Sequence, residues 1–273
     1  MQKRLLTISD ISCMGKCSLT TALPILSVLG HECVPLPTAL LSAHTAAFPE
    51  YELTDLTDSF GRILDHFERR QVSFDGILTG YLTTARQFDR TAELLTVYKG
   101  KIPLVVDPVL GDHGRLYAGF NEEQVKAARL LWRQADYLLP NLTEAAFLLG
   151  ETPFSEGSDP DEAYLRETAE KLAQFGACVM LTGVTRGDRI GVYVYHGGNA
   201  AYFSTPRQEG IFHGTGDILA AAFFGLLAGG SSPEEAAEKA ARFVGLCVEK
   251  TAGSSDRRDY GITFEPYLST LLM

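Results

Sequence analysis

The sequence predicts an α/β protein with a mostly parallel central sheet and helices on both of its faces. Short apolar runs alternate with amphipathic stretches over most of the 273 residues. Each apolar run ends at glycine, proline or polar residues before the next helical period begins. This alternation is typical of βαβ units, in which helices join parallel strands and cover the sheet on both sides.

The predicted elements follow one another regularly up to residue 182. We expect strands over 4–9, 33–36, 76–79, 104–107, 137–140 and 178–182. Between them we expect helices over 18–29, 55–70, 84–98, 121–134, 143–149 and 161–175. The polar stretch 155–159 is predicted to be a loop within the domain.

The pattern changes after residue 182. Two short strands over 191–196 and 200–204 are separated by a Gly-Gly-Asn turn, which predicts a β-hairpin. A glycine-containing turn over 210–217 then leads into an apolar helix that ends near Ala228. A Ser-Pro-Glu-Glu start predicts one more helix, which runs to about Thr251.

Length and composition limit the classes of protein. No repeat, low-complexity tract or long linker divides the chain, so we expect a single domain over 1–273. The net charge of −10 argues against a nucleic-acid partner, because phosphate backbones recruit Lys and Arg. A phosphorylated small molecule stays compatible with this charge, since helix N-termini bind phosphate through backbone N–H groups.

The N-terminal segment and the cysteines indicate a cytoplasmic protein with no membrane partner. No signal peptide precedes the first strand, and no apolar run reaches membrane-spanning length. The five scattered cysteines suit a reduced compartment. Cys13 and Cys17 have no second pair at zinc-like spacing, so packing or loop roles are favoured over metal binding.

The segment Gly214-Thr215-Gly216-Asp217 opens a long apolar helix and predicts a phosphoryl-transfer site. Two glycines let the backbone approach a ligand closely, and the N–H groups of the helix N-terminus form an anion hole. Asp217 can act there as general base towards a hydroxyl group. The alternative is a tight turn capped by Asp217, and the flanking apolar helix favours the functional interpretation.

Two further acidic segments follow predicted strands, at the edge where open parallel sheets bind ligands. Asp107 and Asp112 are candidates for Mg2+ binding through water, and the alternative is an Asp-Pro turn with a solvated second Asp. Asn141 and Glu144 fit a helix capping box, or Glu144 helps to hold metal-bound phosphate oxygens.

The loop over 12–18 follows the first predicted strand but lacks the spacing of a P-loop, so a Walker-type nucleotide site is rejected. The loop either contacts an acceptor substrate or simply joins a strand to a helix. His44 after the second strand and His213 beside the glycine turn are candidate contacts, with structural roles as the alternative.

These segments, in this order, resemble the ribokinase-like superfamily, and within it the pyridoxal kinases of vitamin B6 salvage. The resemblance spans nearly the whole chain. Its most specific parts are Asp107 to Asp112 with Tyr117, Pro140-Asn141-x-x-Glu144, Thr79-Gly80-Tyr81, His44-Thr45 and Gly214 to Asp217.

The resemblance implies a three-layer α/β/α fold with a small lid, formed by the second strand and its following loop. It implies that ATP with Mg2+ phosphorylates the 5′-hydroxymethyl group of pyridoxal, pyridoxamine or pyridoxine. Asp217 would deprotonate that group, and the amides of Gly214, Thr215 and Gly216 would stabilise the transferred phosphoryl group, with Asp107 and Glu144 organising the metal. Nucleotide contacts are implied at Asp107, Asp112, Tyr117, Asn141, Glu144, Thr182, Gly214 and Gly216, and substrate contacts at Asp10, Ser12, Thr45, Tyr81 and Asp217.

The chain departs from the familiar pyridoxal kinases after the first strand. Asp10 stands where they have a Ser that contacts the ring, and Lys16-Cys17-Ser18 replaces their Gly-Asn pair. Asp10 could pair with a pyridinium or an aminomethyl group, so we expect pyridoxamine to be a good substrate. The resemblance also implies a homodimer through the lid edge, and it leaves a dependence on K+ open.

Two alternatives stay open beside a pyridoxal kinase, and a third one fails. Hydroxymethylpyrimidine (phosphate) kinases share the fold and the reaction, but typical members carry Cys where Asp217 stands. A non-catalytic vitamer-binding protein would not need a base, so the joint presence of Asp217, Asp107 and Glu144 argues against it. A dinucleotide-binding oxidoreductase lacks its glycine fingerprint after the N-terminal strand.

Overall fold

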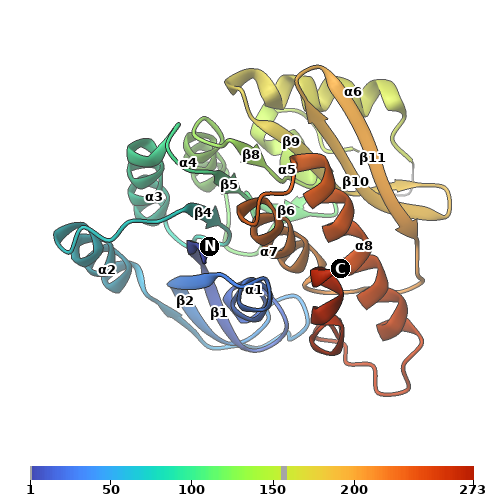
Figure 1. Ribbon diagram of the computed structural model, residues 1–273, viewed down its shortest axis with the longest axis horizontal. Helices are drawn as coiled ribbons and strands as arrows, with labels where there is room; N and C mark the ends of the chain where they lie inside the picture. Colours follow the sequence, from blue (N-terminus) through green and yellow to red (C-terminus); the bar gives the residue numbers. More distant parts are fainter. Residues whose placement is uncertain (1, 155–158) are drawn as a thin grey trace.

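A computed structural model describes residues 2–154 and 159–273, and its main feature is one nine-stranded sheet (Figure 1). The strand order is β11-β10-β9-β8-β5-β4-β1-β2-β3. These strands are β1 Arg4–Met14, β2 Glu32–Ala43, β3 Leu53–Asp55, β4 Gly76–Thr79, β5 Leu104–Val106, β8 Tyr137–Leu138, β9 Cys178–Arg186, β10 Arg189–His196 and β11 Asn199–Pro206. The expected loop over 155–159 lies outside the described residues, except for Asp159.

Helices cover both faces of the sheet and complete three layers. The helices are α1 Ser18–Val28, α2 Thr57–Arg69, α3 Ala85–Tyr98, α4 Glu122–Trp132, α5 Leu142–Leu149, α6 Glu162–Leu172, α7 Thr215–Ala228 and α8 Pro233–Ala252. Figure 1 shows α1, α7 and α8 together on one face, and these helices pack in one hydrophobic cluster. Helices α2 to α6 contribute to a second cluster on the other face. The predicted α/β fold is confirmed.

The pairing of the strands is mostly parallel, as predicted. The six strands from β2 through β1, β4, β5 and β8 to β9 are parallel, while β3, β10 and β11 pair antiparallel. The predicted hairpin joins β10 to β11 through Gly197 and Gly198, which have φ values of 59° and 84°. Such positive φ angles match the twist of a two-residue hairpin turn.

The first two strands are longer than predicted, which corrects the expected place of the N-terminal site residues. Asp10 and Ser12 lie inside β1 rather than in a loop after it. The register between β1 and β2 shifts between Ser9 and Ile11, and such irregularities re-aim side chains near active sites. The polar residues of this run suggested that the strand ends before them. Inside the sheet, however, the Ser12 hydroxyl donates a 3.0 Å hydrogen bond to the Asp10 carboxylate, so both polar side chains have a partner within the strand.

The sequence patterns missed three short elements. These are β3, the two-stranded sheet of β6 Gly111–Asp112 and β7 Arg115–Leu116, and the C-terminal 3-10 helix Glu265–Leu272. The strands β3, β6 and β7 have only two or three residues, which is too short to show a period. The antiparallel pair of β2 and β3 extends the sheet at the edge where the lid was expected.

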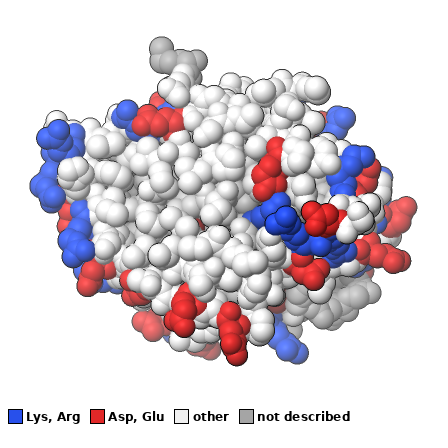
Figure 2. All heavy atoms as spheres, turned by 90° about the horizontal axis from the view of Figure 1, so that it is seen from below, with Lys and Arg blue, Asp and Glu red and all other residues white. Residues whose placement is uncertain are grey.

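Charged side chains of both signs lie mainly around the rim of the face in Figure 2, and much of its middle is uncharged.

Within residues 2–154 and 159–273, no helix combines the length and the apolar character that crossing a membrane requires.

Candidate active site

The carboxyl ends of the central strands gather four acidic side chains from distant parts of the sequence. Asp10 lies in β1, Asp107 follows β5, Glu144 lies in α5 and Asp217 lies in α7. Asp107 is close enough to Glu144 and Asp217, and Asp217 to Asp10, for their charges to interact. The charge interactions therefore link the predicted nucleotide and substrate residues through Asp217.

A small cavity of about 20 Å³ lies between Asp107 and Asp217. Its other polar side chains come from Thr7, Ser9, Ser18 and Thr79. A cavity of this size accommodates one water-sized group. The space beside Asp217 therefore suits a hydroxyl group.

The glycine turn packs directly against the turn that begins α1. Gly214 has a φ of 80°, and a Cβ atom there would lie 1.8 Å from the Lys16 carbonyl oxygen. Only glycine can therefore occupy this position. A Cβ atom at Gly216 would have no described heavy atom within 4 Å, so this side of the turn has room for a ligand.

Asp217 is half-buried in the first turn of α7. Burial raises the pKa of its carboxyl group to about 7, and the charge of Asp10 adds to this rise. Hydrogen bonding from the backbone and side chain of Ser18 opposes the increase in pKa. A base whose pKa lies near neutrality is suited to accept a proton from an alcohol as its bond to phosphorus forms.

Asp10 is buried among hydroxyl groups. It is 4% exposed, and burial raises the pKa of its carboxyl group while hydrogen bonds from Ser18, Ser12 and Ser9 oppose the rise. The structure thus brings together the predicted substrate residues Asp10 and Ser12, with Asp217 near them.

Ser18 and Cys17 were not predicted as individual site residues. Ser18 begins α1 with a φ of 52°, a left-handed conformation that is uncommon for serine. Cys17 is buried, and the pKa of its thiol is raised by burial first and then by the charges of Asp217 and Asp10. The thiol therefore stays protonated. The sequence carries no motif that identifies either residue.

On the nucleotide side, Asn141 and Glu144 form the predicted capping box of α5. Asn141 Oδ1 accepts from Glu144 N, and Glu144 Oε2 accepts from Asn141 N, both at 2.9 Å. Glu144 Oε1 also accepts from Leu110 N at 2.9 Å, and Asn141 Nδ2 donates to Gly111 O at 2.8 Å. The two residues therefore fix the loop that follows Asp107.

The other predicted nucleotide residues surround this loop. Asp112 is exposed in β6, and Tyr117, which is 39% exposed, donates its backbone N–H to Leu110 O at 3.0 Å. Burial and the charge of Glu144 raise the pKa of the Tyr117 phenol. Thr182 forms an isolated parallel β-bridge with Asn141. These residues thus gather near the end of β5.

The carboxylates at this edge fit a hard cation such as Mg2+, which prefers oxygen ligands and keeps much of its hydration. Burial, Glu144 and Asp217 raise the pKa of Asp107 well above its usual range, which marks a place where a cation would be stabilised. Among the described residues, no group of three or more His, Cys, Asp and Glu side chains is arranged to hold a metal ion. Phosphate oxygens and water would therefore have to complete the coordination.

The predicted acceptor residues are only partly brought together. Tyr81 donates its N–H to Ser9 Oγ at 3.1 Å, and its ring stacks on Phe120 at 5.6 Å. Burial and then the charge of Asp10 raise the pKa of the Tyr81 phenol to about 12. Thr45 is exposed, and among the described residues it has no hydrogen bond to another predicted site residue.

His44 and His213 lie beside each other near the glycine turn. Their ring centroids are 5.3 Å apart. Burial and then His213 lower the pKa of His44 to about 4, and burial lowers the pKa of His213. Both imidazoles are therefore neutral at pH 7, and they form a neutral part of the wall next to the turn.

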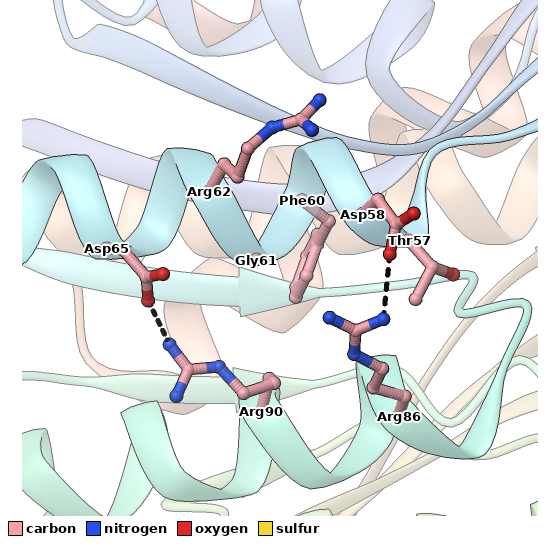
Figure 3. A pocket seen from close by; sticks show the side chains of 8 residues that line it. All are labelled: Thr57, Asp58, Phe60, Gly61, Arg62, Asp65, Arg86 and Arg90. Atoms are coloured by element: carbon pink, nitrogen blue, oxygen red, sulfur yellow. Dashed lines mark hydrogen bonds and ion pairs between the residues drawn. The ribbon is translucent and has the colours of Figure 1, made fainter.

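A larger cavity of about 270 Å³ lies between α2 and α3 and contains none of the predicted site residues (Figure 3). Two ion pairs cross it, Asp58 with Arg86 at 2.7 Å and Asp65 with Arg90 at 2.6 Å. The two pairs neutralise four of the five charged side chains that line the cavity, and Arg62 is the fifth. We therefore keep the carboxylate edge as the candidate active site.

A family model described as phosphomethylpyrimidine kinase matches residues 27–258, which is most of the chain. The chain belongs to this family. Its description is that of a kinase, so the prediction of a phosphotransferase is confirmed.

Two solved structures are similar over the whole chain. Pyridoxal kinase from Lactobacillus plantarum is 34% identical with a TM-score of 0.91, covering 100% of this chain and 97% of that protein. A Bacteroides thetaiotaomicron protein described as a phosphomethylpyrimidine kinase, in a crystal form with pyridoxal, is 35% identical with a TM-score of 0.93, covering 100% of this chain and 96% of that protein. The likeness to the Lactobacillus plantarum enzyme confirms the predicted resemblance to pyridoxal kinases.

Pyridoxal kinase from Dictyostelium discoideum is 30% identical over 156 residues, or 55% of this chain. The matched region spans about half of that relative, 51% of its length.

Proposed function

We propose that this protein transfers the γ-phosphoryl group of ATP to the 5′-hydroxymethyl group of a B6 vitamer. The observation that carries the proposal is the half-buried Asp217, which follows the glycine turn beside a cavity that suits a hydroxyl group. The likeness to pyridoxal kinases, and to a protein crystallised with pyridoxal, supports the choice of acceptor. The whole chain acts as one kinase domain.

In this reaction Asp217 accepts the proton of the vitamer hydroxyl as the oxygen attacks the γ-phosphorus. The bond from that phosphorus to the bridging oxygen of ADP breaks at the same time. The backbone N–H groups of Gly214, Thr215 and Gly216 stabilise the charge on the transferred group. Asp10, Ser12, Thr45 and Tyr81 bind the acceptor. The nucleotide contacts are Asp107, Asp112, Tyr117, Asn141, Glu144, Thr182 and the turn glycines.

Asp107 and Glu144 would hold Mg2+, Asp107 more directly because both oxygens of Glu144 already accept backbone N–H groups. The ion would supply charge neutralisation between the phosphates. Activity in Mg2+ and its loss in EDTA, with recovery on adding Mg2+ again, test this assignment. Assays in KCl and NaCl test whether K+ is also needed.

Hydroxymethylpyrimidine is the second candidate acceptor, because the matching family is described as phosphomethylpyrimidine kinase. An aminopyrimidine alcohol presents the same primary hydroxyl group to Asp217. The vitamer is favoured because a carboxylate, rather than a thiol, stands at the position of the base.

A substrate panel tests the proposal. Pyridoxal, pyridoxamine, pyridoxine and hydroxymethylpyrimidine are each assayed with MgATP, and phosphorylated product is identified by mass spectrometry. We expect the highest kcat/KM for a vitamer, with pyridoxamine a good substrate because of Asp10. Higher kcat/KM for hydroxymethylpyrimidine, or ATP consumption with no acceptor phosphorylated, would contradict the assignment.

The same proposal includes a cytoplasmic homodimer that forms through the edge of β2 and β3. The five free cysteines suit a reduced compartment. Leu40 and Leu53 are 42% and 41% exposed at this edge, where a partner would cover them. One chain has a mass of 29.8 kDa, and analytical ultracentrifugation should give a particle of twice this mass. A monomer at micromolar concentration would remove the dimer from the proposal.

A further inference from the structure

A buried glutamine of α3 is bound to three neighbouring segments on the acceptor side. Gln87 is 0% exposed. Its Nε2 donates to Thr38 O at 2.8 Å and to Thr57 Oγ1 at 3.0 Å. Its Oε1 accepts from the backbone N–H and the hydroxyl of Thr83, both at 2.9 Å. These four bonds use both donors and both lone pairs of the amide group.

The chemistry of the partners fixes the orientation of the Gln87 amide. The Thr38 carbonyl can only accept a hydrogen bond, and the Thr83 N–H can only donate one. If the amide were flipped, its NH2 group would face the Thr83 N–H and its oxygen would face the Thr38 carbonyl oxygen. The side chain therefore joins β2 and the start of α2 to the loop before α3 in one defined geometry.

This geometry determines the place of Tyr81. Thr38 Oγ1 donates to Tyr81 O at 2.8 Å, so the residue that binds Gln87 through its carbonyl binds Tyr81 through its hydroxyl. Thr83, the other main partner of Gln87, lies two residues after Tyr81. The loop that carries the Tyr81 ring is thus fixed at both ends.

We propose that Gln87 is a positioning residue for the acceptor, acting through Thr38 and Thr83 on Tyr81. The inference rests on the proposed function, in which Tyr81 borders the vitamer ring. It goes beyond that function by assigning part of the acceptor affinity to a residue of α3 that is linked to Tyr81 through these two threonines.

The first test compares Gln87→Met with Thr91→Val. Methionine keeps the length of the side chain and removes all four hydrogen bonds. Thr91 lies one helical turn further along α3, is also 0% exposed, and its hydroxyl has no partner among the described residues. We expect the KM for pyridoxal to rise about 10-fold in Gln87→Met, with kcat and the KM for MgATP changed less than about 2-fold. Thr91→Val should keep all three parameters.

A second control is the exposed ion pair at the neighbouring surface. Asp58 and Arg86 are 78% and 65% exposed in their side chains (Figure 3), and such pairs contribute little to stability. Asp58→Asn should therefore leave the KM for pyridoxal unchanged. A rise in KM equal to that of Gln87→Met would overturn the assignment to Gln87.

A double-mutant cycle separates positioning from general support of the fold. If Gln87 acts through Tyr81, Gln87→Met should raise KM much less in a Tyr81→Ala background. Thr38→Val, which removes only the bond to Tyr81 O, should reproduce the KM change if Gln87→Met does not fold. A full KM effect in the Tyr81→Ala background, or a fall in kcat and Tm with KM unchanged, would overturn the inference.

Hydrogen exchange tests the inference independently of any activity. The amides over 81–83 should exchange faster in Gln87→Met than in the wild type, and Thr91→Val should match the wild type. Unchanged exchange over this loop would overturn the positioning role. An enzyme that fails to phosphorylate any vitamer, yet shows faster exchange in Gln87→Met, would refute the proposed function instead.

Discussion

At the scale of single residues, the main feature of the candidate site is the proposed base, Asp217, in an acidic environment. Burial and the charge of Asp10 raise the pKa of Asp217, while hydrogen bonding from Ser18 opposes the rise. Burial, and after it the charge of Asp10, thus bring the pKa of Asp217 close to neutral pH instead of leaving the carboxyl group ionised down to low pH. In the proposed function, Asp10 therefore has two effects, one on the acceptor and one on the pKa of Asp217.

The pH dependence of catalysis follows from this environment. Because Asp217 must be deprotonated to act as base, kcat/KM should rise with pH through a value near its pKa of about 7. Asp10→Asn removes one negative charge, so the pKa of Asp217 should fall and the rise should move to lower pH. Initial rates between pH 5 and 9 measure both profiles. A profile that stays in place in Asp10→Asn would show that Asp10 does not act on the base.

At the scale of elements, the glycine turn and α1 depend on each other. The turn lies against the Lys16 carbonyl oxygen, and the backbone of Ser18 binds Asp217. The N-termini of α1 and α7 therefore meet at the base. This contact joins residues about 200 positions apart, so no local pattern in the sequence could have indicated it.

Gly214→Ala should disrupt this contact. The added Cβ would lie 1.8 Å from Lys16 O, so the turn must move away from the transferred phosphoryl group. We expect kcat to fall about 100-fold or more, since misplacement of about 1 Å costs this much. Steady-state kinetics and a thermal melt measure the effect.

Gly100→Ala is the matched control for Gly214→Ala. Gly100 has a similar φ of 73°, but a Cβ atom there would have no described heavy atom within 4 Å. The substitution should lower the free energy of unfolding by about 1–2 kcal/mol, through backbone conformation alone, and the variant should keep full activity. Full activity in Gly214→Ala would mean that the contact with Lys16 does not position the turn.

The capping box of α5 also has a function beyond its helix, because Glu144 binds the loop after Asp107. Glu144→Gln places an amide NH2 where the second oxygen accepts a backbone N–H, which leaves one buried donor without an acceptor. The KM for MgATP should rise about 10-fold, since an unsatisfied buried donor costs about 1–3 kcal/mol. Gln124→Ala, in the exposed capping box of α4, should leave this KM unchanged. Equal KM values for Glu144→Gln and the wild type would limit Glu144 to a structural role.

At the scale of the whole molecule, the sequence predicted the layers better than it predicted the site. The alternation of apolar and amphipathic runs indicated the parallel sheet, because burial imposes those periods directly. The bulged course of β1 near Asp10, the stacking of Phe120 on Tyr81 and the Gln87 bonds could not be predicted. They depend on contacts between segments that only the tertiary fold brings together.

The raised pKa of Asp217 should also affect the stability of the whole fold. The pKa of Asp217 is raised in the folded state, so its contribution to stability is complete below about pH 4 and is lost as pH rises through about 7. The Asp217→Asn variant does not lose this stability, because an amide does not ionise as the pH rises. Its Tm should exceed that of the wild type at pH 8 by about 2–4 °C for each kcal/mol regained, and match it at pH 4. Equal Tm values at pH 8 would show that the carboxylate is not destabilised by the fold.

The central claim is that Asp217 is the base of a vitamer kinase, and the turnover of Asp217→Asn tests it most directly. With saturating MgATP and pyridoxal, we predict that kcat falls by about 10²–10⁴-fold, the usual span for a lost general base. Nucleotide binding, measured by titration calorimetry, should persist because the glycine turn and the Asp107 loop are intact. A variant that binds nucleotide and turns over pyridoxal at a near-normal rate would contradict the account.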